Sequence, residues 1–288
     1  MVDFDVIVVR DLQQLLEVLA SEPDARIVAG ATDFIPFVQA GKWRPRLAVE
    51  ITGVQELRGH RLTDGWLEIG PLVTHRELAS SALLREKAAA LAEAAQSVGD
   101  PLIRARATIG GNICTGSPAA DAVPALLVLG AQLTLLSQTG SRCVPLSEFL
   151  VGPGKTALRP GEVLAAIRFP VDSASAGTAF VKLGRRQAMA ISVANAAAYV
   201  EMDGDRITAC RVALGSLAPT VVRCSAMEAH LIGKLWDAGA LAGSAAMVSE
   251  AVRPIDDVRA SASYRRAVAP DLARRALVQA GEKIGRQL

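Results

Sequence analysis

The stretch of sequence that decides the fold reads Ala107-Thr108-Ile109-Gly110-Gly111-Asn112 and continues through Ser117-Pro118 to Asp121. Two adjacent glycines carry no Cβ, so main-chain N–H groups in such a turn can approach an anion or the polar rim of a ring system. Asp121 follows this turn closely. Its carboxylate either accepts hydrogen bonds from a sugar or caps the next helix, and on local grounds the cap is the commoner role.

A second turn of this kind lies near the N-terminus and reads Ile27-Val28-Ala29-Gly30-Ala31-Thr32-Asp33-Phe34. The pattern is typical of a strand, a tight turn and the start of a helix, where backbone N–H groups and the helix dipole favour an anion. Neither turn matches the G-x-G-x-x-G or the Walker pattern, so dinucleotide folds of those kinds are not indicated. One such turn alone is weak evidence of a ligand, whereas the two together are a much stronger signal.

Composition places the chain among ordinary globular proteins. Its 288 residues include 31 Lys and Arg against 29 Asp and Glu, which gives a net charge of +2, and 51% of the residues are hydrophobic. The length exceeds one domain of roughly 100–200 residues, and the composition excludes a disordered chain. The weak net charge and an aromatic content of 4% disfavour nucleic-acid binding.

The cysteines argue against a metal site. They form no C-x-x-C pair and no cluster with histidine, and they are Cys114, Cys143, Cys210 and Cys224. We therefore expect reduced thiols and neither zinc nor an iron–sulfur cluster held by this chain alone. The longest apolar stretch, residues 122–136, is too short to span a bilayer, and the first residues are acidic where a secretory signal is basic. A soluble cytoplasmic protein is expected.

Patterning divides the chain into three parts. Residues 1–53 predict one small α/β lobe, and residues 54–172 predict a second lobe. Residues 173–288 predict a C-terminal domain of a small antiparallel sheet with helices. The small and polar stretch 172–177 is a plausible linker between them. The predicted fold class is α+β, with two α/β lobes that form a ligand cleft.

Several local elements can be predicted within these parts. Residues 11–20 predict an amphipathic helix, and the apolar runs 26–29 and 47–51 predict parallel strands. An Ala- and Leu-rich helix is expected over residues 83–95. The turn Asp203-Gly-Asp205 between two β-like runs predicts an antiparallel hairpin.

Seven stretches in this order resemble one family, the FAD-binding medium subunits of molybdenum-containing hydroxylases, such as those of carbon monoxide dehydrogenase and bacterial xanthine dehydrogenase. The resemblance covers nearly the whole chain. The stretches are Ala29-Gly-Ala-Thr-Asp33, Arg106-Ala-Thr-Ile-Gly-Gly-Asn-Ile113 with Ser117-Pro118 and Asp121, Gly152-Pro-Gly-Lys-Thr156, Gly161-Glu-Val-Leu164, Lys182-Leu-Gly-Arg-Arg186, Arg211-Val-Ala-Leu-Gly-Ser-Leu-Ala-Pro-Thr220 and Arg259-Ala-Ser-Ala-Ser-Tyr-Arg-Arg266.

The resemblance implies a bound FAD. It assigns the two turns to the diphosphate, Asp121 to the sugar or ribityl part, and Leu164 and Lys182 to the flavin ring, where an ammonium favours the reduced state. The implied cofactor-binding residues are Ile27, Val28, Ala29, Gly30, Ala31, Thr32, Asp33, Phe34, Thr108, Ile109, Gly110, Gly111, Asn112, Asp121, Leu164 and Lys182. No catalytic and no metal-ligating residue is expected in this chain.

The function implied by the resemblance is electron transfer within a heteromeric oxidoreductase. A large subunit with a molybdopterin centre would oxidise the substrate, and a small subunit would carry [2Fe–2S] clusters. FAD here would take electrons from the clusters and pass them to NAD+, a quinone or another acceptor. One alternative is a self-contained FAD-dependent oxidoreductase of the same broad fold, which would need its own acid or base. Another is an assembly subunit that has lost flavin.

Other residues receive simpler interpretations. Ala31 stands where the family often has glycine and is expected to keep a negative φ, which would hold the first turn farther from a phosphate. The histidines have surface-like contexts and are expected to bind nothing: His60, His75 and His230. A C-terminal arginine-rich helix is expected to be a solvated face or a docking surface, and it carries Arg265, Arg266, Arg274 and Arg275.

Overall fold

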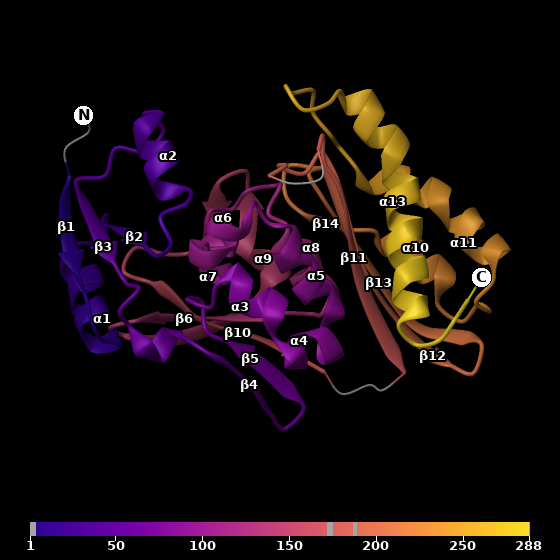
Figure 1. Ribbon diagram of the computed structural model, residues 1–288, viewed down its shortest axis with the longest axis horizontal. Coiled ribbons are helices and arrows are strands. Elements are labelled where there is room, and N and C mark those ends of the chain that lie inside the picture. Colours follow the sequence, from indigo (N-terminus) through magenta and orange to yellow (C-terminus); the bar gives the residue numbers. More distant parts are fainter. Residues whose placement is uncertain (1–3, 172–174, 187–188, 288) are drawn as a thin grey trace.

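The computed structural model describes residues 4–171, 175–186 and 189–287. The three larger sheets follow one another along the longest axis of the molecule, in chain order from the N-terminal lobe to the C-terminal domain (Figure 1), and β8 (Leu150–Gly152) and β9 (Lys155–Thr156) form a further two-stranded sheet. The helices of the second lobe lie between the N-terminal lobe and the third sheet. No helix in the described part of the chain is long and apolar enough to cross a membrane.

The N-terminal lobe is a three-stranded parallel sheet in the order β1–β3–β2. The two predicted parallel strands are β2 and β3, and strand β1 was not predicted. Helix α1 begins at Asp11, whose carboxylate accepts a hydrogen bond of 2.8 Å from the Gln14 N–H. It buries Leu15 and Leu19 against the sheet. The elements are β1 (Asp5–Val8), α1 (Leu12–Ser21), β2 (Arg26–Val28), α2 (Phe34–Gln39) and β3 (Leu47–Glu50).

The second lobe is a five-stranded sheet in the order β4–β5–β10–β6–β7, and it is antiparallel throughout. Its strands and short helices are η1 (Gln55–Leu57), β4 (His60–Thr63), β5 (Trp66–Ile69), α3 (His75–Ser80), α4 (Ala82–Lys87), α5 (Ala89–Ser97), α6 (Pro101–Arg106), α7 (Ile109–Cys114), α8 (Ala122–Val128), β6 (Gln132–Ser137), β7 (Gly140–Pro145), α9 (Leu146–Phe149), β8 (Leu150–Gly152), β9 (Lys155–Thr156) and β10 (Val163–Pro170). The single helix predicted over residues 83–95 is wrong. It is two helices, because Ala88 leaves the helical conformation with φ −148° and is fully buried.

The C-terminal domain is a four-stranded antiparallel sheet in the order β11–β12–β13–β14, and the predicted hairpin at residues 203–205 joins two of its strands. Both faces are buried: Ala197 and Ala213 pack on the second lobe, and Ala196 and Val212 pack on the C-terminal helices. The elements are β11 (Ala176–Leu183), β12 (Ala194–Asp203), β13 (Arg206–Gly215), β14 (Val222–Arg223), α10 (Ser225–Leu231), α11 (Ala238–Ser244), η2 (Ala245–Met247), α12 (Val248–Ala251) and α13 (Ala262–Glu282).

The predicted linker falls partly outside the described residues. Its first positions, residues 172–174, are not described, and strand β11 already begins at Ala176. Residue Gly177 then lies within the sheet, where a Cβ would come 1.9 Å from the Ala280 carbonyl oxygen of α13. This glycine is therefore part of the packing between sheet and helix.

Candidate functional site

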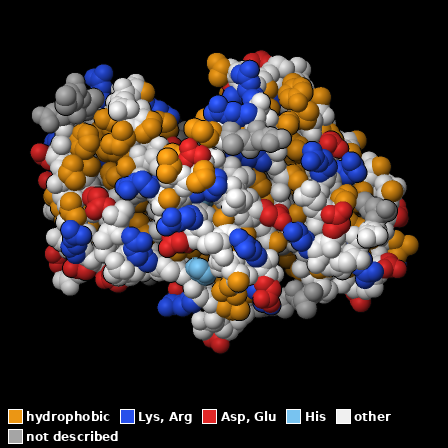
Figure 2. Space-filling model, in the orientation of Figure 1, with side chains coloured by type: hydrophobic (Ala, Val, Ile, Leu, Met, Phe, Trp, Pro, Cys, Tyr) orange, Lys and Arg blue, Asp and Glu red, His pale blue; other side chains and the backbone are white. Residues whose placement is uncertain are grey.

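A cavity of about 1110 Å³ lies where the two lobes and the C-terminal domain meet. Figure 2 shows the surface hollowed at the top, between the N-terminal lobe on the left and the C-terminal domain on the right. Ligand sites commonly have volumes of about 300–1,000 Å³, so this cavity is large enough for an extended ligand.

The cavity brings together most of the predicted cofactor residues. The first turn contributes all of residues 27–34, and Asp121 and Leu164 line the cavity farther along. The second turn contributes Thr108, Gly110, Gly111 and Asn112. Two predicted residues do not line it. Ile109 is fully buried in the core of the second lobe, and Lys182 lies behind Asp121, to which it is hydrogen-bonded.

The glycines of the two turns serve different purposes. A Cβ on Gly30 would lie 2.0 Å from the Arg106 carbonyl oxygen, and one on Gly110 would lie 2.5 Å from Cβ of Pro71. These two glycines allow close packing within the protein. A Cβ on Gly111 would meet only Oγ1 of Thr108, at 3.2 Å. The missing side chain of Gly111 therefore keeps part of the cavity free.

The second turn uses its own N–H groups inside the fold. Ile109 N–H donates to the Val73 carbonyl and Gly110 N–H to the Pro71 carbonyl, both at 2.9 Å. The Gly111 N–H donates to Oγ1 of Thr108 at 3.1 Å, which caps helix α7. The donors that the sequence assigns to a phosphate at this turn are thus already engaged.

The first turn has the opposite arrangement. Within the described chain, no hydrogen bond engages the N–H groups of residues 30–33. Ala31 adopts φ +62°, so the predicted negative φ is wrong. The left-handed conformation costs an alanine about 1–2 kcal/mol. Turns that include a left-handed residue are a common way for proteins to present successive N–H groups to an anion. The first turn, more than the second, offers free donors to the cavity.

Asp121 joins the second lobe to the C-terminal domain. Its side chain caps no helix, and its Oδ2 accepts a 2.6 Å hydrogen bond from Nζ of Lys182. Its Oδ1 accepts hydrogen bonds from Oγ of Ser192 at 2.6 Å and Nδ2 of Asn195 at 2.8 Å. The carboxylate is only 6% exposed. Asp121 therefore does not cap helix α8. Its carboxylate instead accepts hydrogen bonds from the C-terminal domain, including strands β11 and β12.

His75 is buried, so its predicted surface location is wrong. Burial, and secondarily the charge of Arg104, lowers the pKa of the imidazole to about 4. Neither ring nitrogen has a hydrogen-bond partner among the described residues. The backbone N–H of His75 donates to the Ala107 carbonyl, directly before the second turn. The sequence shows the start of helix α3 but not what packs over its first residue.

Arg265 is likewise buried rather than solvated, with 2% of its surface exposed. It donates to the Ser216 carbonyl at 3.0 Å and pairs with the Asp257 carboxylate at 2.7 Å. Hydrogen bonds from Arg259 and Arg265 hold the pKa of Asp257 well below its usual range. Of the predicted arginine face, only Arg266 and the residues farther along α13 are exposed.

Sequence reasoning missed the third wall of the cavity, which belongs to the C-terminal domain. Its residues are Met189, Ala190, Ile191, Ser216, Ala218, Pro219, Arg253, Pro254, Ile255, Arg259 and Arg265. A signal for part of this wall was present, since residues 211–220 and 259–266 are among the family-like stretches. Their placement at the cavity depends on long-range packing.

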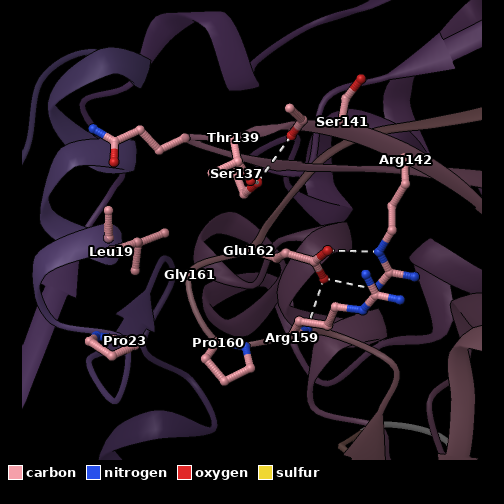
Figure 3. A pocket seen from close by; sticks show the side chains of 13 residues that line it. Leu19, Pro23, Ser137, Thr139, Ser141, Arg142, Arg159, Pro160, Gly161 and Glu162 are labelled. Carbon is pink, nitrogen blue, oxygen red and sulfur yellow. Dashed lines mark hydrogen bonds and ion pairs between the residues drawn. The ribbon is translucent and has the colours of Figure 1, made fainter.

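A smaller hollow of about 420 Å³ adjoins the cavity and shares Leu19, Pro23 and residues 159–162 with it (Figure 3). In Figure 3, Glu162 points toward Arg142, and the two form an ion pair with Nε and Oε1 2.7 Å apart. Hydrogen bonds from Arg142 lower the pKa of Glu162. This paired carboxylate is a structural contact, and in the described chain no three His, Cys, Asp or Glu side chains gather to hold a metal.

The chain matches two known families over most of its length. Residues 2–172 match the FAD binding domain in molybdopterin dehydrogenase, and residues 179–280 match the CO dehydrogenase flavoprotein C-terminal domain. The chain belongs to the FAD-binding subunits of the molybdenum hydroxylases. The predicted family, the α+β fold class and the FAD cofactor are thereby confirmed, and the chain is an oxidoreductase subunit.

Relatives of this flavoprotein subunit span nearly its whole length. The putative xanthine dehydrogenase FAD-binding subunit of Escherichia coli is 36% identical over 88% of each chain. The carbon monoxide dehydrogenase medium chain of Hydrogenophaga pseudoflava is 31% identical over 88% of each chain. The solved carbon monoxide dehydrogenase of the same organism superposes with a TM-score of 0.93, over 97% of this chain and 98% of the other.

The residues of this flavoprotein subunit fit an FAD. The N–H groups of residues 30–33, which have no hydrogen-bond partner in the described chain, suit a diphosphate because they are several donors in one turn that lines the cavity. Gly111 leaves room where a Cβ would fill the cavity. Leu164 also lines the cavity, although it is only 3% exposed and packs mainly in the core of the second lobe.

Proposed function

We propose that this FAD-binding subunit transfers electrons within a heteromeric molybdenum hydroxylase. Bound FAD would accept electrons from the [2Fe–2S] clusters of a small partner subunit and deliver them to NAD+, a quinone or another acceptor. A large partner subunit would hold the molybdopterin and oxidise the substrate. The observation that carries the proposal is the cavity itself, in which the first turn offers N–H donors without hydrogen-bond partners in the described chain.

Three ionisable groups at the cavity, His75, Cys114 and Asp121, are poorly suited to acid–base catalysis, which favours electron transfer over a self-contained enzyme. The imidazole of His75 has a pKa of about 4, and burial raises the pKa of the Cys114 thiol to about 12. A general acid or base works best with a pKa near the operating pH. Asp121 already accepts three hydrogen bonds from the C-terminal domain. A self-contained oxidoreductase would need a freer group over the flavin.

We also propose the residues and domains that serve this function. The diphosphate would lie at residues 27–34 and 108–112, and Asp121 would lie at the sugar or ribityl part. The flavin would lie against Leu164, and Lys182 would act near the ring edge through its ion pair with Asp121. The domains would be residues 1–53 and 54–172 for FAD binding and residues 173–288 for the C-terminal domain. A cytoplasmic location agrees with the four cysteines, all of which are free thiols.

A spectroscopic experiment tests the function. The purified chain should show the absorption of oxidised flavin and should turn over no substrate alone. Coexpressed with its molybdopterin and [2Fe–2S] subunits, it should become reduced when substrate is added to the complex. Gly111→Val serves as a control without flavin. Substrate turnover by the isolated chain would instead support the self-contained enzyme, and absence of flavin from the wild-type chain would contradict both.

A further inference from the structure

The wall that the C-terminal domain adds to the cavity carries an excess of positive charge. Among the described residues of this domain, Arg253, Arg259 and Arg265 line the cavity, and no acidic side chain does. Asp257 forms ion pairs with both Arg259 and Arg265, and these three side chains are called the arginine cluster below. Arg253 donates only to carbonyls of its own turn. Two arginines therefore share a single carboxylate at this wall.

The cation that the sequence assigns to the flavin is, in contrast, neutralised. Nζ of Lys182 lies 2.6 Å from Oδ2 of Asp121, and both side chains are almost buried, so this pair adds no net charge. Arg265 is buried and Arg259 partly buried, so water screens their charge only in part. Asp256, in the same loop as Arg259, is exposed, and water screens its charge more strongly. The charge left over in this part of the cavity is that of the arginine cluster.

Hydrogen bonds place the arginine cluster close to Asp121. The Arg259 guanidinium approaches the Ser192 carbonyl at 3.4 Å, and Oγ of Ser192 donates to Oδ1 of Asp121 at 2.6 Å. Arg265 donates to the carbonyl of Ser216, which also lines the cavity, at 3.0 Å. A single residue therefore connects Arg259 to the carboxylate that the proposed function assigns to the sugar or ribityl part of the cofactor.

Ser216 holds this wall in one conformation. Its φ of +62° is left-handed, which costs a residue with a side chain about 1–2 kcal/mol. Its N–H donates to the Pro118 carbonyl at 2.7 Å, and its Oγ donates to the Ser192 carbonyl at 3.1 Å. Backbone strain of this kind persists only where the surroundings impose it, and it is typical of functional sites. Arg265 is thus bound to a fixed part of the cavity wall.

We propose that the charge of Arg259 and Arg265 raises the midpoint potential of the bound flavin. The inference rests on the proposed function, which places the flavin in this cavity. Reduction by two electrons from the [2Fe–2S] clusters, with uptake of one proton, leaves one negative charge on the ring, and a fixed cation nearby favours that product. Asp257 limits the effect, because its carboxylate cancels one of the two positive charges. FAD would thereby become a better acceptor for those electrons.

Removal of charges of opposite sign tests the proposal in the full chain loaded with FAD. Arg259→Gln should weaken the binding of reduced FAD relative to oxidised FAD by about tenfold, which lowers the midpoint potential by about 30 mV. Asp257→Asn should raise the midpoint potential by a similar amount, since both arginines keep their charge. A merely structural role gives no reason for opposite shifts. Equilibration with a redox dye measures the midpoint, and flavin fluorescence measures the affinity for oxidised FAD.

Three matched variants serve as controls. Arg259→Lys keeps the charge and should restore at least half of the shift seen in Arg259→Gln. Arg266→Gln and Asp271→Asn change the net charge by the same amounts at exposed positions on α13 and should leave the midpoint unchanged. Arg259→Gln keeps the pair between Asp257 and Arg265, so its fold should be kept. If Asp257→Asn does not fold, the comparison of Arg259→Gln with Arg259→Lys decides alone.

The outcome separates the charge assignment from the proposed function, because the midpoint potential is measured without partner subunits. An unshifted midpoint in fully flavinylated Arg259→Gln would overturn the charge assignment, and so would a shift of the same sign in Asp257→Asn. Electron transfer stands in that case if substrate still reduces the flavin of the assembled complex. If the opposite shifts occur but substrate does not reduce the flavin of the wild-type complex, the charge assignment stands and electron transfer is wrong.

Discussion

The two turns at the cavity look alike in sequence and differ in what they offer a ligand. The turn at residues 30–33 leaves its N–H groups without partners and contains the left-handed Ala31. In the turn at residues 108–112, three N–H groups donate hydrogen bonds to Val73, Pro71 and Thr108. Its contribution to the cavity is space, because Gly111 has no side chain. A glycine-rich stretch can therefore help to bind a ligand by donating hydrogen bonds from its N–H groups or by leaving room for the ligand. Which of the two applies depends on whether the rest of the fold already accepts those hydrogen bonds.

The two adjacent glycines of the second turn should give a large effect on cofactor binding and on stability, respectively. Gly111→Val should weaken FAD binding at least a hundredfold, because the valine side chain would enter the cavity. The fold should be kept. Gly110→Ala should instead destabilise the protein by about 3 kcal/mol, since its Cβ would lie 2.5 Å from Pro71. Flavin content and urea denaturation measure the two losses. Full flavin occupancy in Gly111→Val would show that this turn is not at the cofactor.

The pair behind the cavity tests whether charge, in addition to shape, matters there. Lys182→Met should cost about 3–5 kcal/mol of stability, because it leaves the Asp121 carboxylate buried and unpaired. The unpaired negative charge should also lower the midpoint potential of bound flavin, by roughly 20 mV for each 1 kcal/mol. The double variant Lys182→Met with Asp121→Asn should restore much of the stability and much of the midpoint potential, because no unpaired charge remains. An unchanged potential in fully flavinylated Lys182→Met would remove Lys182 from the flavin site.

Acid should destabilise the folded protein through protonation of His75, whose backbone N–H is hydrogen-bonded directly before the second turn. Its folded-state pKa of about 4 lies below the ordinary 6.5, so its contribution to stability is complete above pH 6.5 and is lost as the pH falls toward 4. At about 1.4 kcal/mol per pH unit, the loss is about 3 kcal/mol. Urea denaturation near pH 7 and near pH 4 measures it. Between these two pH values, the stability of His75→Phe should fall by about 3 kcal/mol less than that of the wild type. An equal fall in both proteins would contradict the role of His75.

Relief of strain in the first turn should give the smallest effect. Ala31→Gly removes the cost of φ +62° but increases the freedom of the unfolded chain, so stability should rise by no more than about 1 kcal/mol. FAD affinity should stay the same or increase. Ala29→Gly, at a position without positive φ, is the control and should lower stability by about 0.5–1 kcal/mol. A destabilised Ala31→Gly protein would mean that the alanine methyl packs favourably in the turn.

The predictions from sequence held where neighbours in the chain decide the structure. The start of α1 at Asp11, the parallel lobe and the hairpin at residues 203–205 follow from capping, apolar spacing and turn chemistry. The break at Ala88 had no such signal, because alanine and leucine favour a continuous helix. In the structure the helix is interrupted at the fully buried Ala88.

The sequence by itself determined the family, the FAD cofactor and the two turns that approach the cavity. The tertiary structure alone decided how each residue is used: that His75 and Arg265 are buried, that Asp121 binds strands β11 and β12, and that the C-terminal domain forms the third wall. The physical reason is distance along the chain. A local pattern specifies conformation within a few residues, whereas the partner of a buried N–H or carboxylate is set by elements far away in the sequence.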